Sequence, residues 1–254
     1  MGEAALDTTA TTRVYVPSKD EIAGWNRLLN TATPEKIIQF AWQKFPHKLA
    51  VATQFGVEGA TLLHRVAQIA PQAHYFTIDT GLLFHETYTL ADELEKLLGI
   101  KIARIKPEKS VAEQAVTHGA NLWERDPDLC CTLRKVMPMQ DALSGMSAWM
   151  TGIRREQSHT RLETPVVQWD ERFGLVKFAP LANQSKDAIE SYVEEYQLPT
   201  NPLRKLGYLS LGCFTCTRPV KPGEDARAGR WSGRSKTECG LHVTKTDTDS
   251  IKST

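Results

Sequence analysis

The sequence predicts an α/β protein, built on a mostly parallel, twisted sheet with helices on both faces and ending in an irregular C-terminal segment. Short apolar runs of strand length alternate with amphipathic stretches of helix length between residues 49 and 151. After about residue 199 this periodicity disappears, and Gly, Pro and Arg become frequent. Strands that alternate with helices are typical of a sheet covered on both faces.

Two helices are expected to open the fold. Ser18 can cap a helix over Lys19–Leu29, and the sequence Thr33-Pro34-Glu35 starts a second one that runs to about Lys44. Strands are then expected at Leu49–Thr53, Ala73–Ile78, Lys101–Ile105 and Ala148–Thr151. The helices expected between and beside them are Ala60–Ile69, Glu86–Leu98, Ser110–Thr117 and Thr132–Leu143.

The pattern changes after Gly152. Val166–Trp169 and Leu175–Phe178 are expected to pair around a turn, and Lys186–Tyr196 is expected to be helical. We therefore expect a disordered tail (residues 1–17), an α/β domain (18–200) and an irregular segment (201–254) that folds over the sheet or moves above it. Long irregular stretches in compact proteins are more often functional than filler.

Composition limits the classes of function. The formal net charge is +1, which gives no global case for binding nucleic acid or a membrane surface. No apolar run approaches the roughly 20 residues that cross a bilayer, and the N-terminus has no apolar signal core, so a cytoplasmic protein is expected. Between Arg204 and Lys236, however, eight Lys and Arg residues face two acids. This favours a small anionic ligand or cofactor there, and a solvated basic face is the alternative.

Three loops follow strands of the predicted sheet, where ligands of open parallel sheets bind. In the first, Phe55 and Gly56 precede a helix whose free N–H groups can meet an anion, although an ordinary strand–helix turn would look the same. In the second, Asp79-Thr80-Gly81 can bind a ribose hydroxyl or simply form a turn. In the third, Arg154 and Arg155 can hold a phosphate or sulfate, or be a surface pair.

Five cysteines carry the sharpest signal: Cys130, Cys131, Cys213, Cys216 and Cys239. Their odd number argues against a disulfide framework and favours metal binding or catalysis. Adjacent helical residues such as Cys130 and Cys131 diverge by about 100°, which suits different irons of a cuboidal cluster better than one tetrahedral ion. A zinc site stays open as the alternative. Arg134 and Lys135 can offset the negative charge of such a cluster.

The fifth cysteine, Cys239, lies among polar and glycine-rich residues rather than in an apolar pattern. Nearby Lys or Arg lowers the pKa of a thiol, so Cys239 is a candidate nucleophile, with an exposed spare thiol as the alternative. His242 can orient it or serve only a structural role.

Several of these motifs together resemble the sulfonucleotide reductases, and within them the iron–sulfur adenylyl-sulfate reductases. The segments that carry the resemblance cover most of the chain from about residue 50 to 243: Ile78-Asp79-Thr80-Gly81, Cys130-Cys131-x-x-Arg134-Lys135, residues 152–158, Gly212-Cys213-x-x-Cys216-Thr217-Arg218, residues 222–231 and Glu238-Cys239-Gly240-Leu241-His242. Gln54 and Gly59 depart from the Ser and Asp that the family often carries in its first loop.

The resemblance implies an adenine nucleotide α-hydrolase-like fold, related to the ATP pyrophosphatases. It implies a [4Fe–4S] cluster on Cys130, Cys131, Cys213 and Cys216, and attack of Cys239 on the sulfur of adenosine 5′-phosphosulfate. Thioredoxin or a glutaredoxin-type dithiol would then release sulfite. The basic residues implied in binding the phosphosulfate are Lys135, Arg154 or Arg155, Arg227 and Arg230.

Three alternatives are weighed against this interpretation. A reductase of the 3′-phosphorylated nucleotide usually lacks both cysteine pairs, although dual use is open. A zinc-stabilised nucleotide-binding module would carry out no redox chemistry. An ATP pyrophosphatase needs a Ser-Gly-Gly-x-Asp-Ser-type loop, which is absent between Thr53 and Gly59. A homo-oligomer is left open.

Overall fold

The computed structural model describes residues 15–234, 236, 238, 240 and 241. Their centre is a six-stranded sheet with the order β3-β2-β1-β4-β6-β5. The strands are β1 (Leu49–Thr53), β2 (His74–Ile78), β3 (Ala103–Ile105), β4 (Ala148–Thr151), β5 (Val167–Asp170) and β6 (Leu175–Phe178). All neighbouring pairs are parallel except β5 with β6, which is antiparallel. The predicted α/β class and mostly parallel sheet are confirmed.

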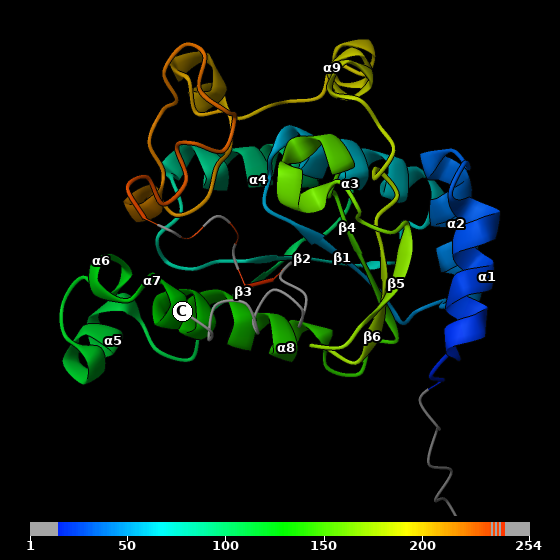
Figure 1. Ribbon diagram of the computed structural model, residues 1–254, viewed down its shortest axis with the longest axis horizontal. Coiled ribbons are helices and arrows are strands. Elements are labelled where there is room, and N and C mark those ends of the chain that lie inside the picture. Colours follow the sequence, from blue (N-terminus) through cyan, green and yellow to red (C-terminus); the bar gives the residue numbers. More distant parts are fainter. Residues whose placement is uncertain (1–14, 235, 237, 239, 242–254) are drawn as a thin grey trace, which may run out of the picture.

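Helices cover both faces of this sheet (Figure 1). The α-helices are α1 (Lys19–Leu29), α2 (Pro34–Lys44), α3 (Val57–Ile69), α4 (His85–Leu98), α5 (Val111–His118), α6 (Leu122–Arg125), α7 (Pro127–Cys131), α8 (Met137–Leu143) and α9 (Lys186–Glu195). Figure 1 shows α3 and α4 on one side of the strands and α8 on the other. No helix of the described residues is both long and apolar enough to cross a membrane.

Strand alternation sends successive side chains of β1 into two cores. Leu49 and Val51 belong to the larger core, together with residues of α2 and α3, and Ala50 belongs to the smaller one, together with Met139 and Leu143 of α8. Successive side chains of a strand point to opposite faces, so a strand buried on both faces reads as one apolar run. All three of these β1 side chains are fully buried.

Local signals set the starts of several helices. Ser18 and Ser110 each form a reciprocal capping box with the glutamate three residues later, Glu21 and Glu113. Thr33 caps α2 through the N–H of Lys36, and Pro34 occupies the first turn. These helices therefore begin at or within one residue of the predicted positions.

The structure differs from the predictions in several elements. Strand β3 begins at Ala103 rather than Lys101, and other strand ends shift by one residue. Helix α3 begins at Val57 rather than Ala60, which puts Glu58 in its first turn. The expected helix over Thr132–Leu143 begins with a π-helical turn, Thr132–Val136. Helices α6 and α7 were not predicted, because four or five residues are too few to show a helical period.

The irregular character of the segment from residue 201 onward is confirmed over its described residues. It contains only the 3-10 turns Pro202–Leu206 and Phe214–Cys216. The division at residues 17 and 200 into tail, domain and C-terminal segment stays a prediction, and residues 1–14 lie outside the described part of the chain.

Candidate functional site

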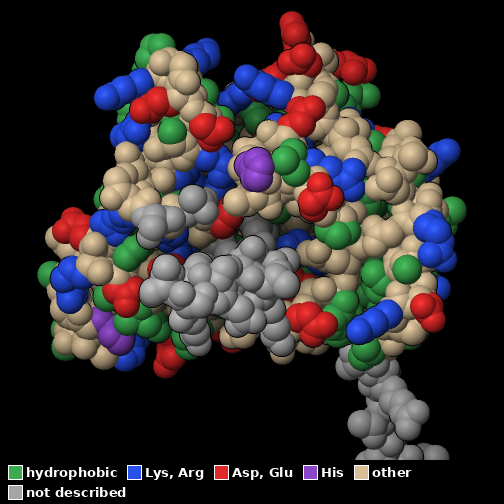
Figure 2. Space-filling view, viewed as in Figure 1, with side chains coloured by type: hydrophobic (Ala, Val, Ile, Leu, Met, Phe, Trp, Pro, Cys, Tyr) green, Lys and Arg blue, Asp and Glu red, His purple; other side chains and the backbone are tan. Residues whose placement is uncertain are grey.

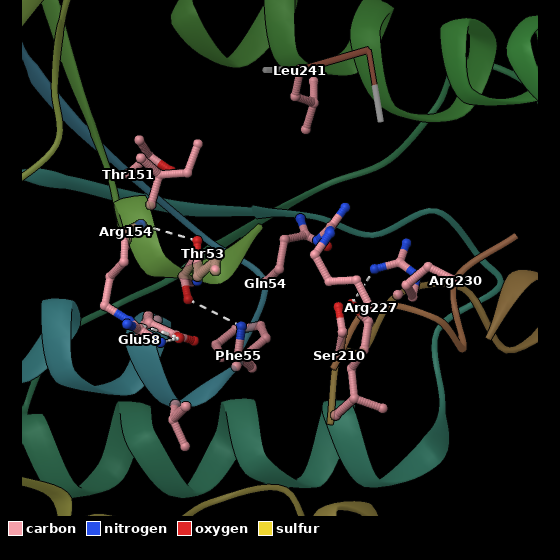
Figure 3. A pocket seen from close by; sticks show the side chains of 18 of the residues that line it. Thr53, Gln54, Phe55, Glu58, Thr151, Arg154, Ser210, Arg227, Arg230 and Leu241 are labelled. Atoms are coloured by element: carbon pink, nitrogen blue, oxygen red, sulfur yellow. Dashed lines mark hydrogen bonds and ion pairs between the residues drawn. The ribbon is translucent and has the colours of Figure 1, made fainter. Parts of the chain in front are cut away.

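A cavity of about 330 Å³ opens at the carboxyl ends of β1 and β4, and we call it the cation cavity. The site residues predicted from the sequence that line it are Phe55, Gly56, Lys135, Arg154, Arg227 and Arg230. Figure 3 shows Arg154 with Glu58 on one side of this space and Arg227 with Arg230 on the other. In Figure 2, which has the same orientation as Figure 1, blue Lys and Arg side chains are visible between the upper and the lower part of the molecule. The arrangement suits an anionic ligand.

The loop after β1 forms the floor of the cation cavity. Phe55 adopts a left-handed backbone conformation, with φ 57°, and its N–H donates to Thr53 Oγ1 at 3.1 Å. A Cβ atom on Gly59 would lie 2.6 Å from the same Thr53 oxygen. Glycine at position 59, where the family often carries Asp, therefore allows the first turn of α3 to approach β1 closely.

The two arginines after β4 have different surroundings. Arg154 is 5% exposed, and its Nε and Nη2 both donate to Glu58 Oε1, at 3.1 and 2.9 Å. Arg155 does not line the cation cavity; its guanidinium donates to the Thr164 carbonyl at 2.9 Å and to Asn30 Oδ1 at 3.2 Å. Of the predicted pair, the structure brings only Arg154 to the cavity, already paired with a carboxylate. Contact of either arginine with substrate stays a prediction.

Arg230 comes from the opposite wall. Its Nη1 donates to the Leu211 carbonyl at 2.8 Å, and its guanidinium lies 4.5 Å from the ring centre of Trp231. Its buried Nε has no hydrogen-bond partner among the described residues. A Cβ atom on Gly212 would lie 2.2 Å from Arg230 Nη2, so only glycine at position 212 leaves room for this guanidinium.

Four of the five cysteines line a second, smaller pocket: Cys130, Cys131, Cys213 and Cys216. We call it the cysteine pocket. The first two lie at the end of α7, whose first turn is capped by the side chain of Asp126, and the π-helical turn follows them directly. Single π-helical turns often mark functional sites. The structure thus brings two sequence-distant cysteine pairs together, as predicted.

The second pair is held against the loop after β2. Leu83 and Cys213 form an antiparallel bridge, and the Phe214 N–H donates to the Leu82 carbonyl at 2.9 Å. This pairing joins residues that are 130 positions apart in the sequence. It fixes Cys213 and Cys216 opposite α7.

The Asp79-Thr80-Gly81 loop lies outside the lining of the cation cavity, and one of its residues contacts a cysteine. Thr80 Oγ1 lies 3.3 Å from Cys213 Sγ. Asp79 accepts hydrogen bonds from the Tyr88 hydroxyl at 2.6 Å and from the Gly81 N–H at 3.0 Å. None of these three loop residues lines the cavity. Their expected contact with substrate stays a prediction, and of the three the structure places Thr80 beside a cysteine, Cys213.

Two cations predicted to balance a cluster border the cysteine pocket. Arg134 is 3% exposed and donates to Gln114 Oε1 at 3.1 Å and to the Lys109 carbonyl at 3.2 Å. Burial lowers its pKa, while the neighbouring Cys130 and Cys213 act in the opposite direction. Lys135, 5% exposed, lines both the cation cavity and the cysteine pocket. Lys135 therefore lies between the two sites.

The chemistry of the cysteine pocket fits a multinuclear cluster. Burial, followed by the charges of Cys131, Cys213 and Cys216, raises the pKa of Cys130 to about 11, so four thiolates there need positive charge to balance them. In the described part of the chain, no three His, Cys, Asp or Glu side chains are arranged to ligate one metal ion.

The two remaining predicted site residues, Cys239 and His242, lie outside the described residues. Their described neighbours are Glu238, Gly240 and Leu241, and Leu241 lines the cation cavity. The sequence analysis gave no role to Trp231, which lines both sites, or to Arg161, which lines the cavity. Neither residue belongs to a spacing pattern that would have identified it.

Comparison with known proteins gives one consistent result. The family model of the phosphoadenosine phosphosulfate reductase domain matches residues 48–219. A protein of Streptomyces coelicolor named adenosine 5′-phosphosulfate reductase is 45% identical, over 85% of this chain and 91% of its own length. Proteins of the same name from Halalkalibacterium halodurans and Salinibacter ruber are 44% and 41% identical, over 85% and 91% of this chain and 94% and 92% of their own lengths.

Solved structures agree with this result. The crystal structure of phosphoadenylyl-sulfate reductase from Candida auris, a phosphate complex, matches with a TM-score of 0.72 and 31% identity, over 80% of this chain and 99% of its own. FMN adenylyltransferase from Candida glabrata, at 14% identity and a TM-score of 0.55, covers 94% of this chain and 84% of its own and shares the fold. This agrees with the expected adenine nucleotide α-hydrolase-like fold. The chain belongs to the phosphoadenosine phosphosulfate reductase family.

Proposed function

We propose that this protein reduces adenosine 5′-phosphosulfate to sulfite and AMP in assimilatory sulfate reduction. The observation that carries the proposal is the junction of two sites at Lys135: a cavity lined by arginines and a pocket lined by four cysteines. The first suits an anionic nucleotide and the second suits an iron–sulfur cluster. Relatives that are 41–45% identical carry the name of this activity.

In the proposed first step, the Cys239 thiolate attacks the sulfur of the phosphosulfate. A sulfur–sulfur bond forms, the bond from that sulfur to the phosphate oxygen breaks, and AMP leaves with the electron pair. The product on the protein is a cysteine thiosulfonate. Because thiolate, substrate and leaving group are all anionic, the cations Lys135, Arg227 and Arg230 would offset their repulsion and stabilise the developing charge.

In the proposed second step, a dithiol such as thioredoxin or a glutaredoxin-type protein attacks the Sγ of Cys239. Sulfite leaves, Cys239 is restored as a thiol, and the two dithiol sulfurs become a disulfide, which supplies the two electrons. This step needs the thiosulfonate to be accessible to another protein. It therefore favours a C-terminal segment that opens after the first step. The proposed location of the enzyme is the cytoplasm.

The proposed cofactor is a [4Fe–4S] cluster held by Cys130, Cys131, Cys213 and Cys216. When bound, it would supply a compact charged group beside Lys135 and set the electrostatic field at the adjoining cation cavity. Arg134 and Lys135 would balance part of the negative charge of its thiolates. A brown protein with iron, inorganic sulfide and visible absorbance is the expected result, and a colourless protein with zinc would contradict it.

The competing substrate is the 3′-phosphorylated nucleotide, which the name of the Candida auris relative indicates. The two cysteine pairs favour the unphosphorylated substrate, because the reductases of the 3′-phosphorylated nucleotide usually lack them. The test is sulfite release from each nucleotide with thioredoxin as reductant. A higher kcat/KM on adenosine 5′-phosphosulfate supports the proposal, and a higher value on the 3′-phosphorylated form replaces it with the competitor.

A further inference from the structure

Glu238, which directly precedes Cys239, forms an ion triad with Arg161 and Arg227. Arg161 Nε donates to Glu238 Oε1 and Arg161 Nη2 to Glu238 Oε2, both at 2.9 Å, and Arg227 Nη2 donates to Oε2 at 3.0 Å. The Thr160 hydroxyl adds a fourth hydrogen bond at 3.2 Å. The side chains of Arg161 and Glu238 are each 10% exposed, and that of Arg227 is 15% exposed.

This geometry holds Glu238 firmly. Burial alone would raise the pKa of its carboxyl group, but the hydrogen bond and charge of Arg161 and the charge of Arg227 more than offset burial and lower it. The carboxylate is therefore ionised at neutral pH. Removing one partner of a buried ion pair is strongly destabilising, because it leaves the other charge uncompensated.

The triad joins three segments of the chain. Arg161 ends a 3-10 turn in the loop after β4, Arg227 comes from the irregular segment, and both line the cation cavity. Glu238 lies 77 residues from Arg161 in the sequence. These ion pairs therefore attach Glu238, the residue before Cys239, to the rim of the proposed substrate site.

A second attachment follows Cys239 in the chain. Leu241 is 8% exposed and packs in the smaller core with Phe76, Ile78 and Trp149. Cys239 is therefore bracketed, with a buried charged residue one position before it and a buried apolar residue two positions after it.

We propose that Glu238 is a positioning residue for Cys239, with Arg161 as its dedicated anchor. The inference rests on the proposed function. Glu238 does not contact the reacting sulfur; it sets the distance and direction from which the thiol approaches it. Arg227 contacts both Glu238 and the proposed substrate site, because its guanidinium donates to Glu238 and its side chain lines the cation cavity.

The test is the single-turnover rate of SO₃ addition to the protein, measured by rapid quench and intact-protein mass spectrometry without reductant. Glu238→Gln keeps the side-chain shape and removes the charge. We expect it to slow SO₃ addition by about 10- to 100-fold, the cost expected for a reacting group displaced by roughly 1 Å. The affinity for AMP should change by less than about 3-fold, because the wall of the cavity is otherwise intact.

The matched control is Glu224→Gln. Glu224 also accepts two hydrogen bonds from one guanidinium, at 2.8 and 3.1 Å from Arg218, but it does not line the cavity. Its pair is partly exposed, so we expect the SO₃ addition rate to stay within about 2-fold of wild type. An equal loss in both variants would mean that a general weakening of the irregular segment, and not positioning, explains the effect.

A double-mutant cycle tests the anchor. Arg161→Gln should slow SO₃ addition about as much as Glu238→Gln, and the double variant should be no slower than either single one. A multiplicative loss would show that Arg161 and Glu238 act independently and would overturn the inference. Iron content, measured on each holoenzyme, should match wild type even if the Tm falls, because the triad contains no cluster ligand. A fall in iron content parallel to the loss of rate would indicate a structural role only.

The outcomes separate this inference from the proposed function. If wild type gains no SO₃, the proposed function fails and the inference with it. If wild type gains SO₃ and Glu238→Gln gains it at the same rate, only the positioning role of Glu238 is overturned.

Discussion

The cation cavity and the cysteine pocket differ in how the chain builds them, although Lys135 and Trp231 line both. The cavity follows the general rule for open parallel sheets, because the loops after β1 and β4 form its floor and one wall. The pocket is assembled across the sequence: α7 supplies one cysteine pair, and a segment more than 80 residues later, bridged to the loop after β2, supplies the other.

The difference shows that strand-end loops of one sheet can serve separate sites. The loops after β1 and β4 reach the cavity, whereas in the loop after β2 Thr80 lies beside Cys213. The cations differ likewise. Arg154 is already paired with Glu58, while Arg230 keeps a buried N–H without a partner in the described residues. On the first wall Arg154 is therefore balanced by a carboxylate, and on the other wall Arg227 is paired with Glu238 while Arg230 hydrogen-bonds a backbone carbonyl.

The largest expected effect separates chemistry from cluster binding. Cys239→Ser should reduce sulfite release to background, because the serine hydroxyl cannot form the thiosulfonate. Iron content and visible absorbance should stay at the wild-type level. Sulfite assays and iron determination on the same preparation check both, and retained turnover would remove Cys239 from the mechanism.

Cys213→Ser is expected to affect cluster binding directly. Loss of one of four thiolates should lower iron per chain to less than about half of the wild-type value, since metal affinity depends on the full ligand set. The Tm should fall as well, because Cys213 lies where the irregular segment meets Leu83. An unchanged iron content would refute the ligand assignment.

Gly212→Ala should act on the cavity and spare the pocket. The new Cβ atom would displace the Arg230 guanidinium, which lies at the end of a flexible side chain, so the fold can adjust. Loss of one charged hydrogen bond costs about 1.5–3 kcal/mol, so the affinity for AMP should fall by about 10- to 100-fold at wild-type iron content. Isothermal titration calorimetry measures this.

Gly24→Ala in α1 is the matched control for that substitution. Its Cβ would meet only Arg27 Nη2 at 3.8 Å, and alanine in a helix interior is stabilising by about 0.5–1 kcal/mol. AMP affinity should not change in this variant. A loss of affinity in Gly24→Ala equal to that in Gly212→Ala would remove Arg230 from the account.

The smallest effect is expected for Asp79→Asn. If the loop after β2 serves the cysteine pocket, this substitution should leave AMP affinity within about 2-fold of wild type, because Asp79 shares no partner with the cavity. A large loss of nucleotide affinity would return Asp79 to the substrate site and erase the distinction between the two regions.

Local features of the sequence were enough to predict much of the fold. Capping by Ser18 and Ser110 depends on residues three positions apart, and the continuous apolar run of β1 is legible because both faces of the strand are buried. The cysteine pairs were identified because their spacing is itself a signal, whereas the roles of Arg227 and Arg230 were implied by the resemblance to a known family.

Long-range pairing could not be predicted in the same way. The contact between Thr80 and Cys213 depends on the bridge between Leu83 and Cys213, and no local pattern encodes that bridge. The pairing of Glu58 with Arg154, 96 residues away, is equally invisible in the sequence. Where a polar side chain finds its partner is decided by tertiary packing, so its role becomes clear only from the structure.

The most direct test of the account is mass spectrometry of the protein after it is mixed with adenosine 5′-phosphosulfate in the absence of any dithiol. The account predicts one added SO₃ on the peptide that contains Cys239, and its loss as sulfite when thioredoxin is added. A substrate-treated protein that consumes the nucleotide but carries no SO₃ on that peptide would contradict it.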